Sequence, residues 1–138
     1  MSKLHTTNYY NTFITIADDC PAKAAEVPPI KGDKKTVANL QFDMLIDSPY
    51  KYTSDEVLFQ IYTLRNEIQR NDQKEARELF FSKGQACFRA SPLTKRYGWG
   101  VHFNDEGRMA LYPQESEEYQ RFAADKTLKV VKAMKSVR

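Results

Sequence analysis

The amino-acid sequence predicts an α+β fold in which about four helices cover a small antiparallel sheet. Three observations lead to this prediction. Segments that are rich in aromatic and β-branched residues, or that alternate large and small residues, indicate strands near 9–17, 97–103 and 108–112. Apolar residues at helical spacing fill the stretch between the first two of these strands. With 138 residues, 41% hydrophobic and 28% charged, the chain is long and apolar enough for one domain over 1–138.

The first strand is predicted from the sequence YYNTFITIA at 9–17. Tyr10, Ile14 and Ile16 have the same parity there, so they share one face of the strand. A long loop is expected over 18–35, because this stretch contains three prolines and a glycine. The loop separates the first strand from the helices.

The first two helices are predicted from their spacing and their ends. One runs from about Lys34 to Asp47 and ends before Pro49. The other starts at a capping box, in which the Thr53 hydroxyl and the Glu56 carboxylate satisfy each other's backbone N–H groups. Each helix has an apolar face, formed by Val37, Leu40, Met44 and Leu45 in the first and by Val57, Ile61, Leu64 and Ile68 in the second.

A third helix is expected after Asn71, whose side chain is predicted to cap it. Ala76, Leu79 and Phe80 supply its apolar residues. The helix is expected to stop at Gly84, since glycine adopts the left-handed conformation of a helix end at no steric cost.

The last third of the chain is predicted to contain a hairpin, a helix and one more strand. The hairpin joins 97–103 to 108–112 through the Asn-Asp-Glu-Gly turn at 104–107. A short helix over 113–124 would direct Tyr119 and Phe122 inward. Adjacent valines in the segment 127–134 favour a further strand there over a helix.

The charge distribution excludes some function classes. The net charge is +3, but five of the 21 basic residues lie from Lys126 onward, where there is no acid. The first 125 residues carry 16 basic and 18 acidic side chains, so the body is nearly neutral and its charge is not that of a dedicated DNA-binding domain. Neither an apolar run of membrane-spanning length nor a signal peptide is evident, and we expect a cytoplasmic protein that does not enter the membrane.

The segment 89–102 is the strongest candidate for a binding site. It brings three cations close together in the sequence, and two glycines leave one face of the following strand without side chains. Such a strip of bare sheet can admit a flat or anionic ligand, and a histidine continues the same face. The alternative is that a helix or a bulky side chain of the same chain lies against the glycines. The predicted ligand-binding residues are Arg89, Lys95, Arg96, Tyr97, Gly98, Trp99, Gly100 and His102.

Catalytic and metal sites have less support. Cys20 and Cys87 are too few for a disulfide scaffold, and no nucleophile motif places either of them beside His5 or His102. These four residues are also too scattered for typical zinc-ligand spacing. We therefore predict no catalytic residue and no metal ligand, and the sequence names no cofactor.

Several blocks of the sequence resemble a small bacterial protein family that is known only as a domain of unknown function. The resemblance extends over nearly the whole chain. It implies a single domain and a bacterial cytoplasmic origin, but no activity, cofactor or functional residue. The blocks are HTTNYYNTF at 5–13, DCP at 19–21, GDKKTVANLQF at 32–42, PYKYTSDEVLF at 49–59, FFSKGQACFRASPLTKRYGWGVH at 80–102 and ALYPQESEEY at 110–119.

From these observations we expect a non-enzymatic binding module that holds a small anionic or planar ligand at 89–102. Two alternatives stay open. A nucleic-acid accessory protein would use the same segment together with the lysines of the C-terminal tail, and a protein-interaction module would use the sheet edge or that tail. The oligomeric state is not indicated by the sequence.

Overall fold

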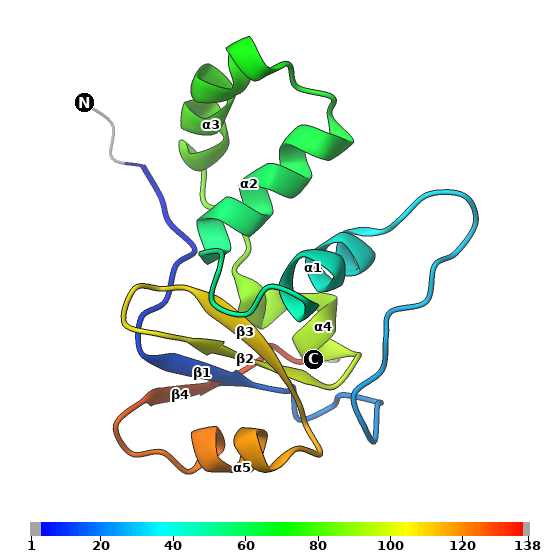
Figure 1. Cartoon of the computed structure of the whole chain (residues 1–138), viewed down its shortest axis with the longest axis vertical. Helices are drawn as coiled ribbons and strands as arrows, with labels where there is room; N and C mark the ends of the chain where they lie inside the picture. The colour runs from blue at the N-terminus through cyan, green and yellow to red at the C-terminus, as the bar shows by residue number, and fades with distance from the viewer. Residues whose placement is uncertain (1–3, 137–138) are drawn as a thin grey trace.

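A computed structural model describes residues 4–136 (Figure 1). The α+β fold class is confirmed. In this part of the chain the helices and strands are β1 (Thr12–Thr15), α1 (Val37–Ile46), α2 (Ser54–Arg65), α3 (Gln73–Phe81), α4 (Pro92–Lys95), β2 (Trp99–Phe103), β3 (Met109–Pro113), α5 (Glu117–Ala123) and β4 (Lys129–Lys132). Two 3₁₀ turns, Arg70–Asp72 and Phe88–Ala90, precede α3 and α4.

The four strands form one sheet in the order β3-β2-β1-β4. β2 pairs antiparallel with both β1 and β3, and its hairpin with β3 is the one that the sequence predicts. β4 differs, because it pairs parallel to β1 and makes the sheet mixed. The reason is the connection from β3 through α5, which crosses the sheet and returns the chain in the original direction.

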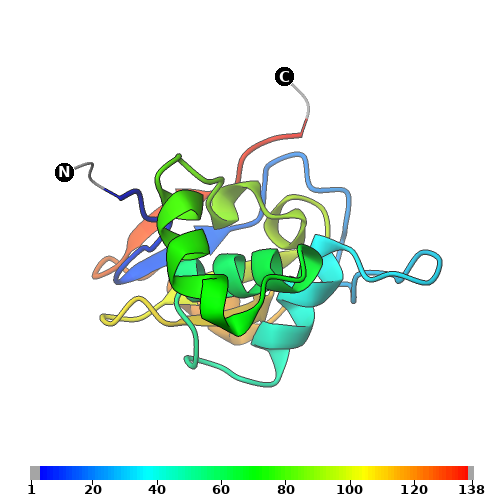
Figure 2. The same cartoon turned by 90° about the horizontal axis from the view of Figure 1, so that it is seen from above.

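Helices cover the two faces of the sheet unequally. α1, α2 and α4 lie over one face, α3 extends beyond α2, and α5 lies alone on the other face (Figures 1 and 2). The main core lies on the first face, where odd-numbered side chains of β2 and β3 meet α1, α2 and α4. Its most deeply buried members include Ile14, Leu45, Val57, Leu93, Val101, Phe103 and Met109.

Capping boxes begin the first two helices. The predicted one at α2 is confirmed: Glu56 N–H donates to Thr53 Oγ1 at 3.2 Å, and Thr53 N–H donates to Glu56 Oε1 at 2.9 Å. α1 has a similar pair, in which Asn39 N–H donates to Thr36 Oγ1 and Thr36 N–H donates to Asn39 Oδ1. Both helices therefore begin where a local side-chain motif satisfies backbone donors.

The prediction for α3 is wrong in its details. Asn71 lies inside the 3₁₀ turn and does not cap the helix, and Gly84 lies beyond the helix end without a positive φ. Leu79 is 65% exposed, and the fully buried residue of this helix is Phe81. Likewise Leu64 of α2 is exposed, so its apolar face is shorter than predicted. A two-turn helix offers too few positions for spacing alone to identify the buried face.

Candidate functional site

The glycine strip predicted on β2 is covered by the chain itself. A Cβ on Gly100 would lie 2.6 Å from both Phe13 Cζ and Tyr119 Cε2, and one on Gly98 would clash with Gln114 Nε2. The expectation of an open face is therefore wrong, and the alternative interpretation is confirmed: Tyr119 of α5 and the ring of Phe13 lie against Gly100, and Gln114 and the backbone of Ala24 lie against Gly98.

The other residues predicted at 89–102 have different surroundings. Arg89 Nε donates to the carbonyl of Lys132 at 2.7 Å, beside β4. Trp99 is buried, donates from Nε1 to the Glu26 carbonyl at 2.8 Å and packs against Phe42. Lys95 is half-buried and Arg96 exposed at the end of α4, and Tyr97 packs against the core. Ligand binding by these side chains stays a prediction. The open face of the sheet from which it was inferred is covered.

His102 belongs to a hydrogen-bonded network on the α5 face. Its Nδ1 lies 2.9 Å from Tyr50 Oη, which lies 2.8 Å from Tyr112 Oη. The imidazole stacks on Phe122 with ring centroids 4.2 Å apart. Burial lowers the pKa of His102 below its ordinary 6.5, and the Asp125 carboxylate opposes this shift. These contacts give His102 a role in fastening the loop before α2 to the sheet.

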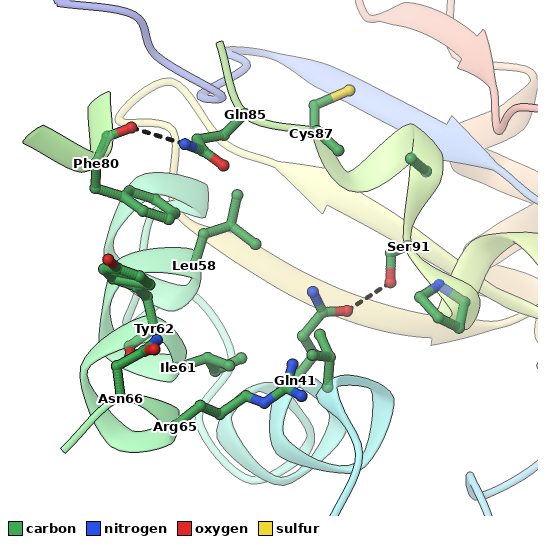
Figure 3. Close-up of a pocket in the computed structure, with 14 residues that line it drawn as sticks. Gln41, Leu58, Ile61, Tyr62, Arg65, Asn66, Phe80, Gln85, Cys87 and Ser91 are labelled. Atoms are coloured by element: carbon green, nitrogen blue, oxygen red, sulfur yellow. Dashed lines mark hydrogen bonds between the residues drawn. The ribbon is translucent and has the colours of Figure 1, made fainter. Parts of the chain in front are cut away.

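A cavity lies between the helices, on the opposite face of the sheet, and we call it the helical pocket (Figure 3). It has a volume of about 570 Å³. The end of the connection from α3 to α4 forms one side and α1 and α2 form the other. Its lining residues are Val37, Gln41, Leu58, Ile61, Tyr62, Arg65, Asn66, Phe80, Gln85, Ala86, Cys87, Ala90, Ser91 and Pro92.

Gln41 and Ser91 are the two buried polar residues that line the pocket, each at 4% exposure. Leu93 N–H donates to Ser91 Oγ, whose own proton is donated to Gln41 Oε1 at 2.6 Å. This bond fixes the amide with its oxygen toward α4. Its Nε2 has no hydrogen-bond partner within residues 4–136 and is directed into the pocket (Figure 3).

A second amide borders the pocket at its other end. Gln85 Nε2 donates to the carbonyl of Phe80 at 2.7 Å, which holds the side chain against the end of α3. Its Oε1 has no hydrogen-bond partner in the described part of the chain and faces the pocket (Figure 3). The pocket therefore presents a donor near α4 and an acceptor near α3.

Between these amides the wall is apolar and aromatic. The rings of Tyr62 and Phe80 lie 4.7 Å apart at an angle of 30°, and Leu58 and Ile61 complete this side. Arg65 is the one charged residue among those that line the pocket, and its side chain extends toward Gln41 (Figure 3).

Cys87 lies at the rim of the pocket. Its Sγ is 3.2 Å from Tyr9 Oη, and burial together with this contact raises the pKa of Tyr9 to about 12. Within residues 4–136, three or more His, Cys, Asp or Glu side chains do not gather anywhere as a metal site would require. The pocket thus offers hydrogen bonds, one positive charge and aromatic surface.

Sequence reasoning missed Gln41, although one signal was available. Val37, Gln41 and Leu45 are four residues apart and share the buried face of α1, so a polar residue there interrupts an apolar face. No comparable signal identifies Gln85, which lies in an irregular segment after α3.

The fold and the pocket define a class of protein: an α+β domain with a mixed four-stranded sheet and a pocket between its helices. The chain belongs to a family of unknown function, DUF6157, whose model matches residues 4–138. No curated protein and no solved structure matches it. None of the helices in the described residues is both long and apolar enough to cross a membrane.

Proposed function

We propose that this protein is a non-enzymatic binding module that holds a small planar or anionic ligand in the helical pocket. The ligand class is the one expected from the sequence, but the site moves from β2 to the space between the helices. Support comes from the volume of about 570 Å³, which lies within the range of small-molecule sites. An apolar wall with a few placed polar groups is the usual composition of such sites.

The observation that carries the proposal is the amide of Gln41. Gln41 is 4% exposed as a residue, and its Nε2 is directed into the pocket without a hydrogen-bond partner in the described residues, where solvent or a ligand can reach it (Figure 3). A ligand that excludes water from this amide has to replace the lost hydrogen bond, because an unpaired buried amide costs about 1–3 kcal/mol. A ligand oxygen at this position would complete the hydrogen bonding of the site.

The first test is a thermal-shift screen of the full chain with small aromatic acids, aromatic amides, nucleotides and sugar phosphates. A ligand at 100 times its Kd adds about 2.7 kcal/mol, which for a domain of this size raises Tm by several degrees. The site is then located by the rate of Cys87 alkylation, followed by peptide mass spectrometry, with Cys20 as the internal reference.

We expect a bound ligand to slow the alkylation of Cys87 and to leave that of Cys20 unchanged. Arg65→Gln should weaken binding, and Arg70→Gln, an exposed arginine outside the pocket, should not. A ligand that raises Tm without slowing the alkylation of either cysteine, and that binds Arg65→Gln as tightly as the wild type, would have its binding site outside the helical pocket. A screen without any hit would refute a small-molecule role.

A further inference from the structure

We infer that the ligand of the helical pocket is an elongated planar molecule with a carboxylate at one end and a hydrogen-bond donor at the other. This inference rests on the proposed function and specifies its ligand. It follows from the different orientations in which the fold holds the two pocket amides, Gln41 and Gln85.

The carboxylate would bind at the end of the pocket near α4. Ser91 Oγ donates to the oxygen of the Gln41 amide, and this bond turns the N–H₂ group toward a ligand in the pocket (Figure 3). Arg65 adds a planar guanidinium, which matches a carboxylate in shape and charge. The pocket lining contains no acidic side chain that would repel the anion.

The donor of the ligand would bind at the end near α3. One N–H of Gln85 donates to the Phe80 carbonyl, and the amide oxygen is directed into the pocket as an acceptor (Figure 3). A second carboxylate at this end would face that oxygen, whereas a hydroxyl or an amine would donate to it. The two ends therefore favour opposite groups.

The planar part of the ligand is inferred from the wall between the two ends. Tyr62 and Phe80 present aromatic surface there, on which a flat ring stacks favourably. The volume of about 570 Å³ has room for more than one ring. A phosphate ester fits less well, because a single cation leaves most of its charge without a partner.

The test uses four naphthalene-derived probes and isothermal titration with the full chain. 6-Hydroxy-2-naphthoate carries both end groups, 2-naphthoate only the acid and 2-naphthol only the hydroxyl, while decahydro-2-naphthoate keeps the acid without the flat ring. We expect the first to bind most tightly. Loss of the carboxylate should weaken binding about ten- to a hundredfold, as loss of a charged hydrogen bond does, and loss of the hydroxyl about tenfold or less.

Three variants assign the ends. Arg65→Gln should weaken the binding of both flat acids about tenfold and leave the affinity for 2-naphthol unchanged. Arg70→Gln is the matched control. Gln41→Glu keeps the oxygen that accepts from Ser91 but replaces the N–H₂ donor with a second oxygen. It should therefore weaken the binding of the two flat acids more than the binding of 2-naphthol. Gln85→Met should remove the advantage of 6-hydroxy-2-naphthoate over 2-naphthoate. Circular dichroism and thermal unfolding of each variant identify any loss of fold.

Equal binding of 2-naphthol and 2-naphthoate, or indifference of the acids to Arg65→Gln, would overturn the inference and leave the proposed function standing. Equal binding of the saturated acid would refute the planar requirement alone. If no probe binds and Cys87 alkylation is unchanged by all four, the inference fails. The proposed function fails with it only if the wider screen also gives no ligand that protects Cys87.

Discussion

Tyr50 combines an unfavourable backbone conformation with a dense set of hydrogen bonds. Its φ of 60° is in the left-handed region, which costs a bulky residue about 1–3 kcal/mol. Its N–H donates to the Met109 carbonyl at 2.7 Å, and its hydroxyl contacts His102 and Tyr112. Burial raises the pKa of Tyr50, so the phenol stays neutral and available for both contacts. The network is what holds this strained residue in place.

His102 gives a prediction for the pH dependence of stability. Because burial lowers its pKa below 6.5 in the folded state, the unfolded chain binds a proton more readily. The free energy of unfolding should therefore fall as pH decreases through 6.5 to the folded pKa, and the stability that the neutral imidazole contributes is fully present well above pH 6.5. Urea unfolding of the wild type and of His102→Gln at several pH values measures the difference.

The slope of the free energy of unfolding against pH should be smaller in His102→Gln than in the wild type. NMR titration of the His102 imidazole gives the same information directly. A His102 pKa above 6.5 would contradict the prediction.

At the scale of elements, α5 is held to the sheet where β2 has no side chain. The ring of Tyr119 packs edge-on against Phe13, with ring centroids 5.1 Å apart, and Tyr119 Oη accepts a hydrogen bond from Ile16 N–H. Both rings fill the space above Gly100. α5, which lies in the connection between the parallel strands β3 and β4, therefore packs on the sheet at Gly100.

Gly100→Ala should therefore destabilise the protein strongly. The added methyl group would lie 2.6 Å from two rings of a packed layer, and overpacking of this kind costs about 1–3 kcal/mol or more. Gly84→Ala is the matched control, since no atom lies within 4 Å of its added Cβ. Thermal and urea unfolding compare the two variants. A Gly100→Ala protein as stable as the wild type would show that this face is open, as the sequence first suggested.

Local motifs were predictable from the sequence, and contacts between distant segments were not. The α2 capping box was found because Thr53 and Glu56 satisfy each other within one turn. The glycines at 98 and 100 indicated that some other group lies close to the backbone there. A glycine does not show whether that group is a ligand or another part of the same chain. The helical pocket was missed because its lining comes from segments between 37 and 92 that only the tertiary fold brings together.

For the whole molecule, the arrangement of charge bears on the nucleic-acid alternative. Arg89 lies next to β4, so part of the predicted basic segment does meet the C-terminal lysines. Acidic groups lie among them, however: Lys132 Nζ pairs with Asp18 at 3.1 Å, and Ser136 N–H donates to Asp19. This surface is therefore mixed in sign.

Salt dependence distinguishes the two functions. A ligand held by one arginine should change its Kd by less than about threefold between 50 and 200 mM NaCl, whereas a protein contacting 6–10 phosphates loses about 10³–10⁵ in affinity. We expect oligonucleotide binding, measured by fluorescence polarisation, to be weak at 50 mM and absent at 200 mM. Tight binding that Arg89→Gln or Lys129→Gln abolishes would instead favour the nucleic-acid role.

The pairing of β1 also bears on how the chain acquires its fold. β1 lies near the beginning of the sequence, yet its partners are β2 and β4, in the last third. During synthesis, β1 leaves the ribosome long before either partner exists, while α1 and α2 already have their capping boxes. The helical layer is thus able to form early, and sheet formation must wait for contacts of high sequence separation, which fold slowly. Until then the apolar face of β1 has to be kept from other chains.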